Sequence, residues 1–200
     1  MITFTSYIKK QVERDDLCGD FARDYIRVTK HPEIYKLKPP QSETLYGFYR
    51  SLPYYADYSI QEVLVNLWYE WIRYKHIGLK FNDGPVGYVY FYKIPNSKVF
   101  KIGRTFNHPE QRKYAVQQES KTELEIYNWM KLSNYDLIES ELKLAFKKNQ
   151  VQREWFQFEY VTSKVCIEID DALDIYSMTD NNYETLKMTA NMADYKREFQ

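Results

Sequence analysis

The 200-residue chain contains little cysteine, carries no net charge and has no long hydrophobic run. Its two cysteines, Cys18 and Cys166, are far apart and match no metal-ligand spacing, so we expect them to be reduced and buried. No secretory signal opens the chain, and no apolar segment is long enough to span a bilayer. These absences argue against a disulfide scaffold, a cysteine-based zinc site and a membrane protein. They predict a cytoplasmic location, or the interior of the host cell if the protein is viral.

The balance of charge gives no overall basic signal for nucleic acid, but it is uneven along the chain. Residues 85–160 contain 12 Lys and Arg against 9 Asp and Glu, whereas residues 161–200 contain 4 against 8. The middle of the chain is therefore mildly basic and its tail acidic. Imbalances of this size usually reflect ordinary solvated surfaces, so they do not identify a partner by themselves.

The first part of the chain has the hydrophobic spacing of helices. Apolar residues recur at helical intervals over 5–12, 19–28 and 44–52, and a longer amphipathic helix follows from Ser59. Ser59 and Glu62 form a capping-box pattern at its start, and Gly78 is a suitable residue for its end. The sequence therefore predicts a helical domain over 1–78.

After the turn-forming residues 82–85 the hydrophobic period changes to that of strands. Three tyrosines alternate with Val89 and Phe91, residues 95–97 form a turn, and 99–102 return as a second strand. Proline in its first turn marks a helix from His108 to about 118. We predict further elements in the order strand 124–130, helix 136–148, strand 155–161 and helix 163–176.

These elements predict an α+β protein. An N-terminal helical bundle should be followed by a small domain in which helices flank a short, mainly antiparallel sheet. The predicted boundaries are 1–78 for the helical domain and 85–162 for the sheet domain. Residues 163–200 are expected to form a C-terminal helix and an acidic polar tail.

The sheet domain contains a spaced set of residues suited to an anionic ligand such as phosphate. Ten residues separate Tyr90 on the first strand from Lys101, which begins a Lys-Ile-Gly-Arg sequence on the second. Arg112 lies on the next helix, and Glu139 on a later one is followed by Phe146 and Glu154-Trp155-Phe156. Over 85–160 this pattern resembles the GIY-YIG nuclease superfamily. The Lys-Ile-Gly motif is similar to that of its phage and viral branch.

The resemblance implies a metal-dependent DNA endonuclease that leaves a 5′-phosphate and a 3′-hydroxyl. Glu139 would hold Mg²⁺ or Mn²⁺ with waters and phosphate oxygens, because hard cations prefer oxygen ligands. Tyr90, with its pKa lowered by nearby cations, would be the general base on water. Lys101 would orient the water or a phosphate oxygen, and Arg112 would hold the scissile phosphate.

Further residues are weaker candidates for this site. Arg104 could contact a flanking phosphate, and His108 could assist at a phosphate or cap its helix. Tyr88 shares the face of Tyr90, as does Tyr92, and either could replace it as the base if the register differs by two residues. Glu141 is expected on a solvated face of its helix.

Each of these residues also has an ordinary interpretation. An alternating tyrosine strand is usually half-buried, and a lone arginine or glutamate on an amphipathic helix is usually at the surface. Three functions therefore remain: an endonuclease acting on duplex or branched DNA, a catalytically weak DNA-binding module, and a protein-interaction module. Convergence of Tyr90, Lys101, Arg112 and Glu139 on one concave surface would favour the first, and scatter over the surface would exclude it.

The N-terminal part resembles a YozE-type SAM-like helical domain over about residues 3–75. Its aromatic start, its Arg14-Asp15-Asp16 turn and its Gly19-Asp20 helix opening carry the resemblance, which implies a compact helical bundle. The aspartates are better placed as helix caps than as a metal cluster. Lys and Arg nearly balance Asp and Glu here, which favours docking to a protein partner or a second copy over direct contact with DNA.

Overall fold

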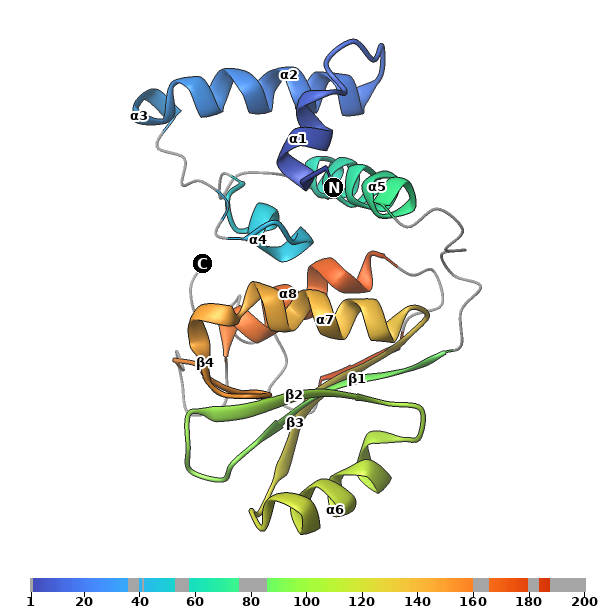
Figure 1. Ribbon diagram of the computed structural model, residues 1–200, viewed down its shortest axis with the longest axis vertical. Coiled ribbons are helices and arrows are strands. Elements are labelled where there is room, and N and C mark those ends of the chain that lie inside the picture. The colour runs from blue at the N-terminus through green and yellow to red at the C-terminus, as the bar shows by residue number, and fades with distance from the viewer. Residues whose placement is uncertain are drawn as a thin grey trace. The chain divides into compact units, whose positions relative to one another are not determined.

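The computed structural model describes residues 2–35, 40, 42–52, 58–75, 86–159, 166–179 and 184–187. The chain divides into two compact units, Met1–Phe81 and Asn82–Gln200 (Figure 1). The first contains helices, and the second contains an antiparallel sheet with helices on both of its faces. The predicted α+β class is therefore confirmed.

The first unit is built from short helices around an aromatic core. Phe4 packs against Phe48 and Trp71, with ring centroids 4.6 and 5.2 Å apart. Asp16 and Thr44 cap two of the helices by accepting hydrogen bonds from backbone amides, as expected of these residue types. The helices are α1 (Phe4–Lys9), α2 (Leu17–Lys30), α3 (Pro32–Tyr35), α4 (Leu45–Tyr49) and α5 (Tyr58–Lys75). The predicted C-terminal glycine, Gly78, lies outside the described residues.

The second unit is a six-stranded sheet in the order β4-β5-β2-β1-β3-β6. Helix α6 lies on one face, and α7 and α8 lie on the other (Figure 1). The strands are β1 (Gly87–Lys93), β2 (Val99–Thr105), β3 (Glu125–Leu132), β4 (Gln150–Gln152), β5 (Trp155–Gln157) and β6 (Glu184–Lys187). The helices are α6 (Pro109–Ser120), α7 (Tyr135–Ala145), the 3-10 turn η1 (Lys147–Asn149) and α8 (Ile167–Ser177).

The alternation of side chains along β1 determines what lies on each face of the sheet. Tyr90 and Tyr92 pack with Val116 of α6, with Tyr88 against the edge of the same cluster. Val89 and Phe91 are fully buried and, by the alternation of a strand, point to the opposite face. The β1–β2 turn contains Asn96 at φ 55°, a left-handed conformation that asparagine tolerates. The hairpin therefore forms where the tyrosine spacing predicts it.

The C-terminal third differs from the prediction in three places. The strand expected over 155–161 ends at Gln157 as β5, with residues 160 and 161 outside the described part of the chain, and β5 pairs with the unpredicted strand β4 in a tight hairpin. The helix expected over 136–148 ends at Ala145, followed by η1. Strand β6 lies in the segment assigned to a polar tail and pairs with β3. Strands of three or four residues carry too little hydrophobic alternation to be recognised in sequence, which explains both omissions.

Within the part of the chain that the structure describes, no helix combines the length and the apolar character needed to cross a membrane.

Candidate functional site

The β1–β2 hairpin positions Tyr90 against a glycine. Tyr90 lies directly opposite Gly103 in the strand register, and a Cβ atom at Gly103 would lie 2.4 Å from the Tyr90 hydroxyl oxygen. The Tyr90 ring stacks on Tyr92, with centroids 4.0 Å apart, and only 2% of Tyr90 is exposed. The absence of a side chain at Gly103 therefore creates the space in which the Tyr90 phenol lies.

The electrostatic surroundings of Tyr90 differ from the prediction. Burial raises the pKa of Tyr90 to about 12, although a hydrogen bond and the positive charge of Arg112 act in the opposite direction. The negative charges of Glu154 and Glu139 raise the pKa further. The pKa of Tyr90 is therefore shifted upward, opposite to the direction expected from nearby cations. Desolvation of the phenolate outweighs one neighbouring guanidinium.

Arg112 connects Tyr90 to the outer surface of α6. Its two terminal nitrogens donate to the two carboxylate oxygens of Glu119, at 3.1 and 3.4 Å, in a bidentate pair. Its positive charge also acts to lower the pKa of the Tyr90 hydroxyl. The guanidinium is therefore held by a carboxylate, in the planar geometry with which arginine binds oxyanions.

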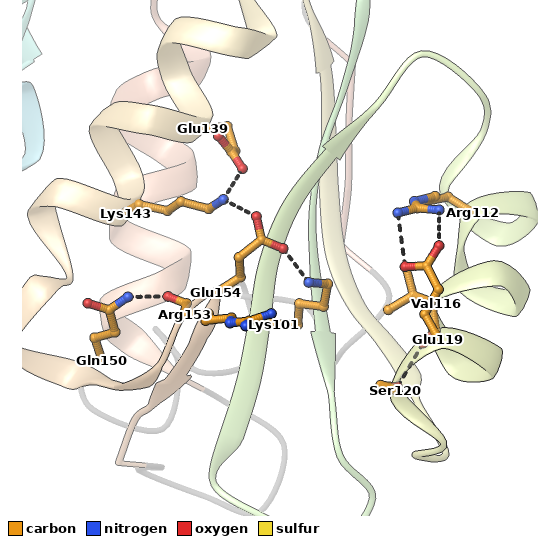
Figure 2. A network of polar contacts seen from close by, with 10 residues as sticks. All are labelled: Lys101, Arg112, Val116, Glu119, Ser120, Glu139, Lys143, Gln150, Arg153 and Glu154. Atoms are coloured by element: carbon orange, nitrogen blue, oxygen red, sulfur yellow. Dashed lines mark hydrogen bonds and ion pairs between the residues drawn. The ribbon is translucent and has the colours of Figure 1, made fainter.

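A second group of charges joins Lys101 to Glu139 (Figure 2). The Lys101 ammonium pairs with one oxygen of Glu154, and the Lys143 ammonium pairs with the other. Lys143 also pairs with Glu139, which lies one helical turn earlier on α7 and is only 7% exposed. Burial tends to raise the pKa of Glu154, but hydrogen bonds from its two lysines lower it below the ordinary value.

The four residues selected by spacing therefore lie in one neighbourhood. Lys101 and Glu139 are linked through Glu154 and Lys143, and the charge of Arg112 acts on the Tyr90 hydroxyl. Glu139 and Glu154 also act electrostatically on the Tyr90 hydroxyl. In the resting protein each of the three charged members is paired with an opposite charge.

The three additional candidates occupy different surroundings. His108 caps α6 by accepting a hydrogen bond from the Glu110 amide through Nδ1, at 3.3 Å. Capping was one of the two roles predicted for this residue. Tyr88 packs edge-on against His108, with ring centroids 5.6 Å apart. Arg104 pairs with Asp136 at the start of α7, and strand alternation directs it to the face opposite Tyr90. The structure therefore brings Tyr88 and His108 together and separates Arg104 from them.

Glu141 was expected to be solvated, and this expectation is wrong. The residue is 7% exposed, and the Tyr176 hydroxyl donates a hydrogen bond to its carboxylate at 3.2 Å. Tyr176 belongs to helix α8, so this hydrogen-bond partner of Glu141 lies 35 positions further along the chain. Helical spacing within α7 alone carries no information on this contact.

Three residues of the network were not selected from the sequence. Lys143 lies four residues after Glu139, the spacing at which side chains meet on a helix, so it could have been identified. Glu119 lies two turns after Arg112 on α6, a spacing that also places two residues on one face. Arg153 adjoins this network only because the β4–β5 hairpin folds back beside β2. No pattern in the sequence indicates this packing of the hairpin.

A divalent cation would have to be held with few protein ligands. Among the described residues there is no group of three or more His, Cys, Asp or Glu side chains arranged to hold a metal ion. A single carboxylate with waters and substrate phosphates is, however, an ordinary way for proteins to bind Mg²⁺. Glu139 is chemically suited to this, and the Lys143 ammonium is its present counter-charge.

Comparison with known proteins connects this unit to a phage-associated family. Residues 87–176 match the model of the T5orf172 domain, which is related to GIY-YIG-like nuclease folds and is compatible with DNA binding. The match includes the hairpin, α6, α7, the β4–β5 hairpin and most of α8. It does not extend to the N-terminal unit, whose similarity to YozE-type domains stays a prediction. No curated protein and no solved structure was found to match the chain.

Proposed function

We propose that the second unit is a DNA endonuclease that requires Mg²⁺ or Mn²⁺. The observation that carries the proposal is the network joining Glu139, Lys143, Glu154 and Lys101 beside the Tyr90–Arg112 pair. Residues chosen for their spacing in the sequence are neighbours in the fold. A phosphodiesterase of this kind needs a phosphate-binding guanidinium, a second cation and a hard oxygen ligand, and the network contains all three.

Phosphate binding is assigned to Arg112 and Lys101. In the resting protein their charges are balanced by Glu119 and Glu154, respectively, and a phosphate would replace these carboxylates as the anionic partner. Arg112 would hold two non-bridging oxygens of the scissile phosphate as it now holds Glu119. It would also stabilise the negative charge that develops on the pentavalent phosphorus.

Glu139 would hold the divalent cation, with Lys143 withdrawing from its present ion pair. A bound cation at this position supplies Lewis-acid stabilisation of charge on the phosphate oxygens. The protein contributes the carboxylate itself, which is positioned by α7 and is almost completely buried. Water would attack phosphorus as the bond to the 3′ oxygen breaks, leaving a 3′-hydroxyl and a 5′-phosphate.

We assign to Tyr90 the role of general base, which accepts the proton of the attacking water. With a pKa raised to about 12, the phenol is neutral at physiological pH in the resting protein. It can act as a base only to the extent that bound cations stabilise the phenolate, and the Arg112 guanidinium is the neighbouring protein group with that effect.

The alternative is a catalytically weak module that binds DNA or protein. The raised pKa of Tyr90 and the internal pairing of Lys101, Arg112 and Glu139 favour it. The N-terminal unit would, in either case, position DNA or dock a partner protein or a second copy, inside the cell. Binding of DNA by the wild-type protein without metal-dependent cleavage would identify this alternative.

Cleavage of supercoiled plasmid with Mg²⁺ or Mn²⁺ tests the proposal. Wild type should nick the plasmid, EDTA should prevent nicking, and Glu139→Gln and Arg112→Ala should each reduce the rate on the order of 100-fold. Glu123→Gln and Lys98→Ala remove comparable charges outside the network and should cleave as wild type does. Equal rates for Glu139→Gln and Glu123→Gln would refute the role of Glu139.

A further inference from the structure

A pocket of about 420 Å³ opens on the α6 face of the sheet, next to the proposed phosphate-binding residues. Its volume lies within the roughly 300–1,000 Å³ of small-ligand sites. Helix α6 packs on β1 and β3, and the pocket lies between the end of α6 and the strands β2 and β5. It is lined by Lys101, Val116, Glu119, Ser120, Arg153, Glu154 and Trp155.

The charges of the lining indicate a neutral occupant. Two carboxylates, Glu119 and Glu154, balance the two cations Lys101 and Arg153. Lys101 and Glu154 form an ion pair across the lining (Figure 2). A phosphate inside this space would meet as much negative as positive charge. A neutral group with hydrogen-bonding edges would instead find donors and acceptors at the rim.

The wall of the pocket suits a flat ring. Trp155 is half-buried, with part of its surface against the tyrosine cluster of β1, and it also lines the pocket. The Lys101 ammonium lies over the Trp155 ring, 5.6 Å from its centroid, so a base stacking on this face would replace the ammonium there. Val116 adds an apolar surface from α6. Aromatic side chains of this kind serve as stacking platforms for nucleobases.

Arg153 lies at the same pocket in an exposed position. It is held at φ 44° in the β4–β5 hairpin by a hydrogen bond from Gln150 to its carbonyl oxygen. Within the described part of the chain its guanidinium has no assigned ion pair or hydrogen bond. A cation in this state is available for a phosphate of the strand that carries the base.

We propose that this pocket receives an unpaired nucleobase adjacent to the phosphate that is cut. The proposal rests on the assigned nuclease function and narrows its substrate to DNA with an unpaired nucleotide, as at a bulge, flap or branch. A base in a continuous duplex would first have to leave the stack, which costs the free energy of unpairing and unstacking. An unpaired base avoids the unpairing part of this cost. Trp155 stacks on the base, and Arg153 binds the neighbouring phosphate.

The coupling of Glu119 to Arg112 gives the pocket a role in catalysis. Glu119 lines the pocket and is also the carboxylate that holds Arg112. When the scissile phosphate replaces this carboxylate on Arg112, Glu119 would lose its partner, and an amino group on the base would donate to it instead. Base and phosphate would then bind together, so that the correct substrate would complete the site.

Binding of labelled DNA hairpins to the full-length protein in EDTA tests the proposal without requiring cleavage. One hairpin carries a single-nucleotide bulge, a second carries an abasic residue at the same bulge, and a third is fully paired. Wild type should bind the bulged base about 10-fold more tightly than the abasic bulge, because one stacked base is lost. Trp155→Ala should remove this difference. Arg153→Ala should weaken both bulged hairpins equally, as loss of a phosphate contact does.

Two further variants guard against misfolding and general surface effects. Ser120→Phe fills the pocket from α6 without changing Trp155 and should also remove the preference for the base. Phe106→Ala removes an aromatic side chain that is 68% exposed and does not line the pocket, and it should keep the preference. Equal affinity of wild type for base and abasic bulges would overturn the proposal.

The outcome separates this inference from the assigned activity. Metal-dependent cleavage of plasmid with no preference for the unpaired base would refute the pocket and leave the nuclease. A base preference that depends on Trp155, without cleavage under any metal, would support the pocket and refute the nuclease. Absence of binding to all three hairpins, together with absence of plasmid cleavage with Mg²⁺ or Mn²⁺, would refute both.

Discussion

At the scale of single residues, the position of Tyr90 depends on the absence of a side chain at Gly103. The tyrosine belongs to a strand pattern that any half-buried strand could show. Its placement against the backbone of Gly103 makes it a deeply buried phenol that the charge of Arg112 influences. The glycine of the Lys-Ile-Gly sequence therefore has a packing role that is independent of catalysis.

Gly103→Ala should destabilise the protein by about 1–3 kcal/mol, the usual cost of forcing an extra carbon into a packed site. The new Cβ would overlap the Tyr90 ring, which cannot move freely because it stacks on Tyr92. Urea unfolding followed by circular dichroism measures the change. The loss of unfolding free energy in the Gly103→Ala, Tyr90→Val double variant should be smaller than the sum of the losses in the two single variants. Strict additivity would show that the two residues do not collide.

At the scale of secondary-structure elements, α7 and the β4–β5 hairpin meet through Lys143. This residue places one ammonium between Glu139 of α7 and Glu154 of the hairpin. It occupies the position between two carboxylates where a divalent cation could also be stabilised. Lysine and metal are therefore expected to compete for Glu139.

Lys143→Ala should lower stability by about 1–3 kcal/mol, because it leaves the nearly buried Glu139 facing Glu154 without a counter-charge. Millimolar MgCl₂ should then raise the melting temperature of the variant more than that of wild type, since the cation replaces the ammonium. Lys147→Ala, on the exposed turn η1, should respond to Mg²⁺ as wild type does. An identical Mg²⁺ effect in all three proteins would contradict competition at Glu139.

At the scale of the whole molecule, buried tyrosines make stability sensitive to alkaline pH. Burial raises the pKa of Tyr90 to about 12 and, with other contributions, raises the pKa values of Tyr92 and Tyr127 above the ordinary tyrosine value. The unfolded chain ionises these groups near pH 10, whereas the folded protein keeps them neutral. Above pH 10 the folded state therefore binds more protons than the unfolded chain. The stability that these tyrosines contribute is complete below pH 10 and declines above it.

The free energy of unfolding should begin to fall near pH 9, because burial also raises the pKa of the Cys166 thiol to about 12, and the buried tyrosines add to the fall above about pH 10. It should then fall by up to about 1.4 kcal/mol per pH unit for each buried tyrosine. Urea titrations from pH 9 to about 11.5, the range below the raised pKa, measure the slope. Tyr90→Phe should reduce the slope because it removes one of these groups. Tyr114→Phe, at a 63% exposed position, should leave the slope unchanged. A slope that is identical in wild type and Tyr90→Phe would contradict the burial argument.

Local sequence patterns were sufficient to predict most of the elements and to identify the candidate residues. The change from helical to strand period located the boundary between the two kinds of structure, and the alternation of Tyr88, Tyr90 and Tyr92 placed them on one face. Proline after His108 located the start of α6, and Asp16 was recognised as a cap. These features depend on neighbours along the chain, which is why periodicity and residue type are sufficient for them.

Tertiary structure alone decided the surroundings of those residues. The raised pKa of Tyr90, the burial of Glu141 by Tyr176 and the pairing of Lys101 with Glu154 all come from segments distant in the sequence. The pocket beside Trp155 exists only because the short β4–β5 hairpin folds back against β2. Desolvation and ion pairing are properties of the packed neighbourhood, so no local pattern encodes them. They determine whether a spaced set of residues can act as a site.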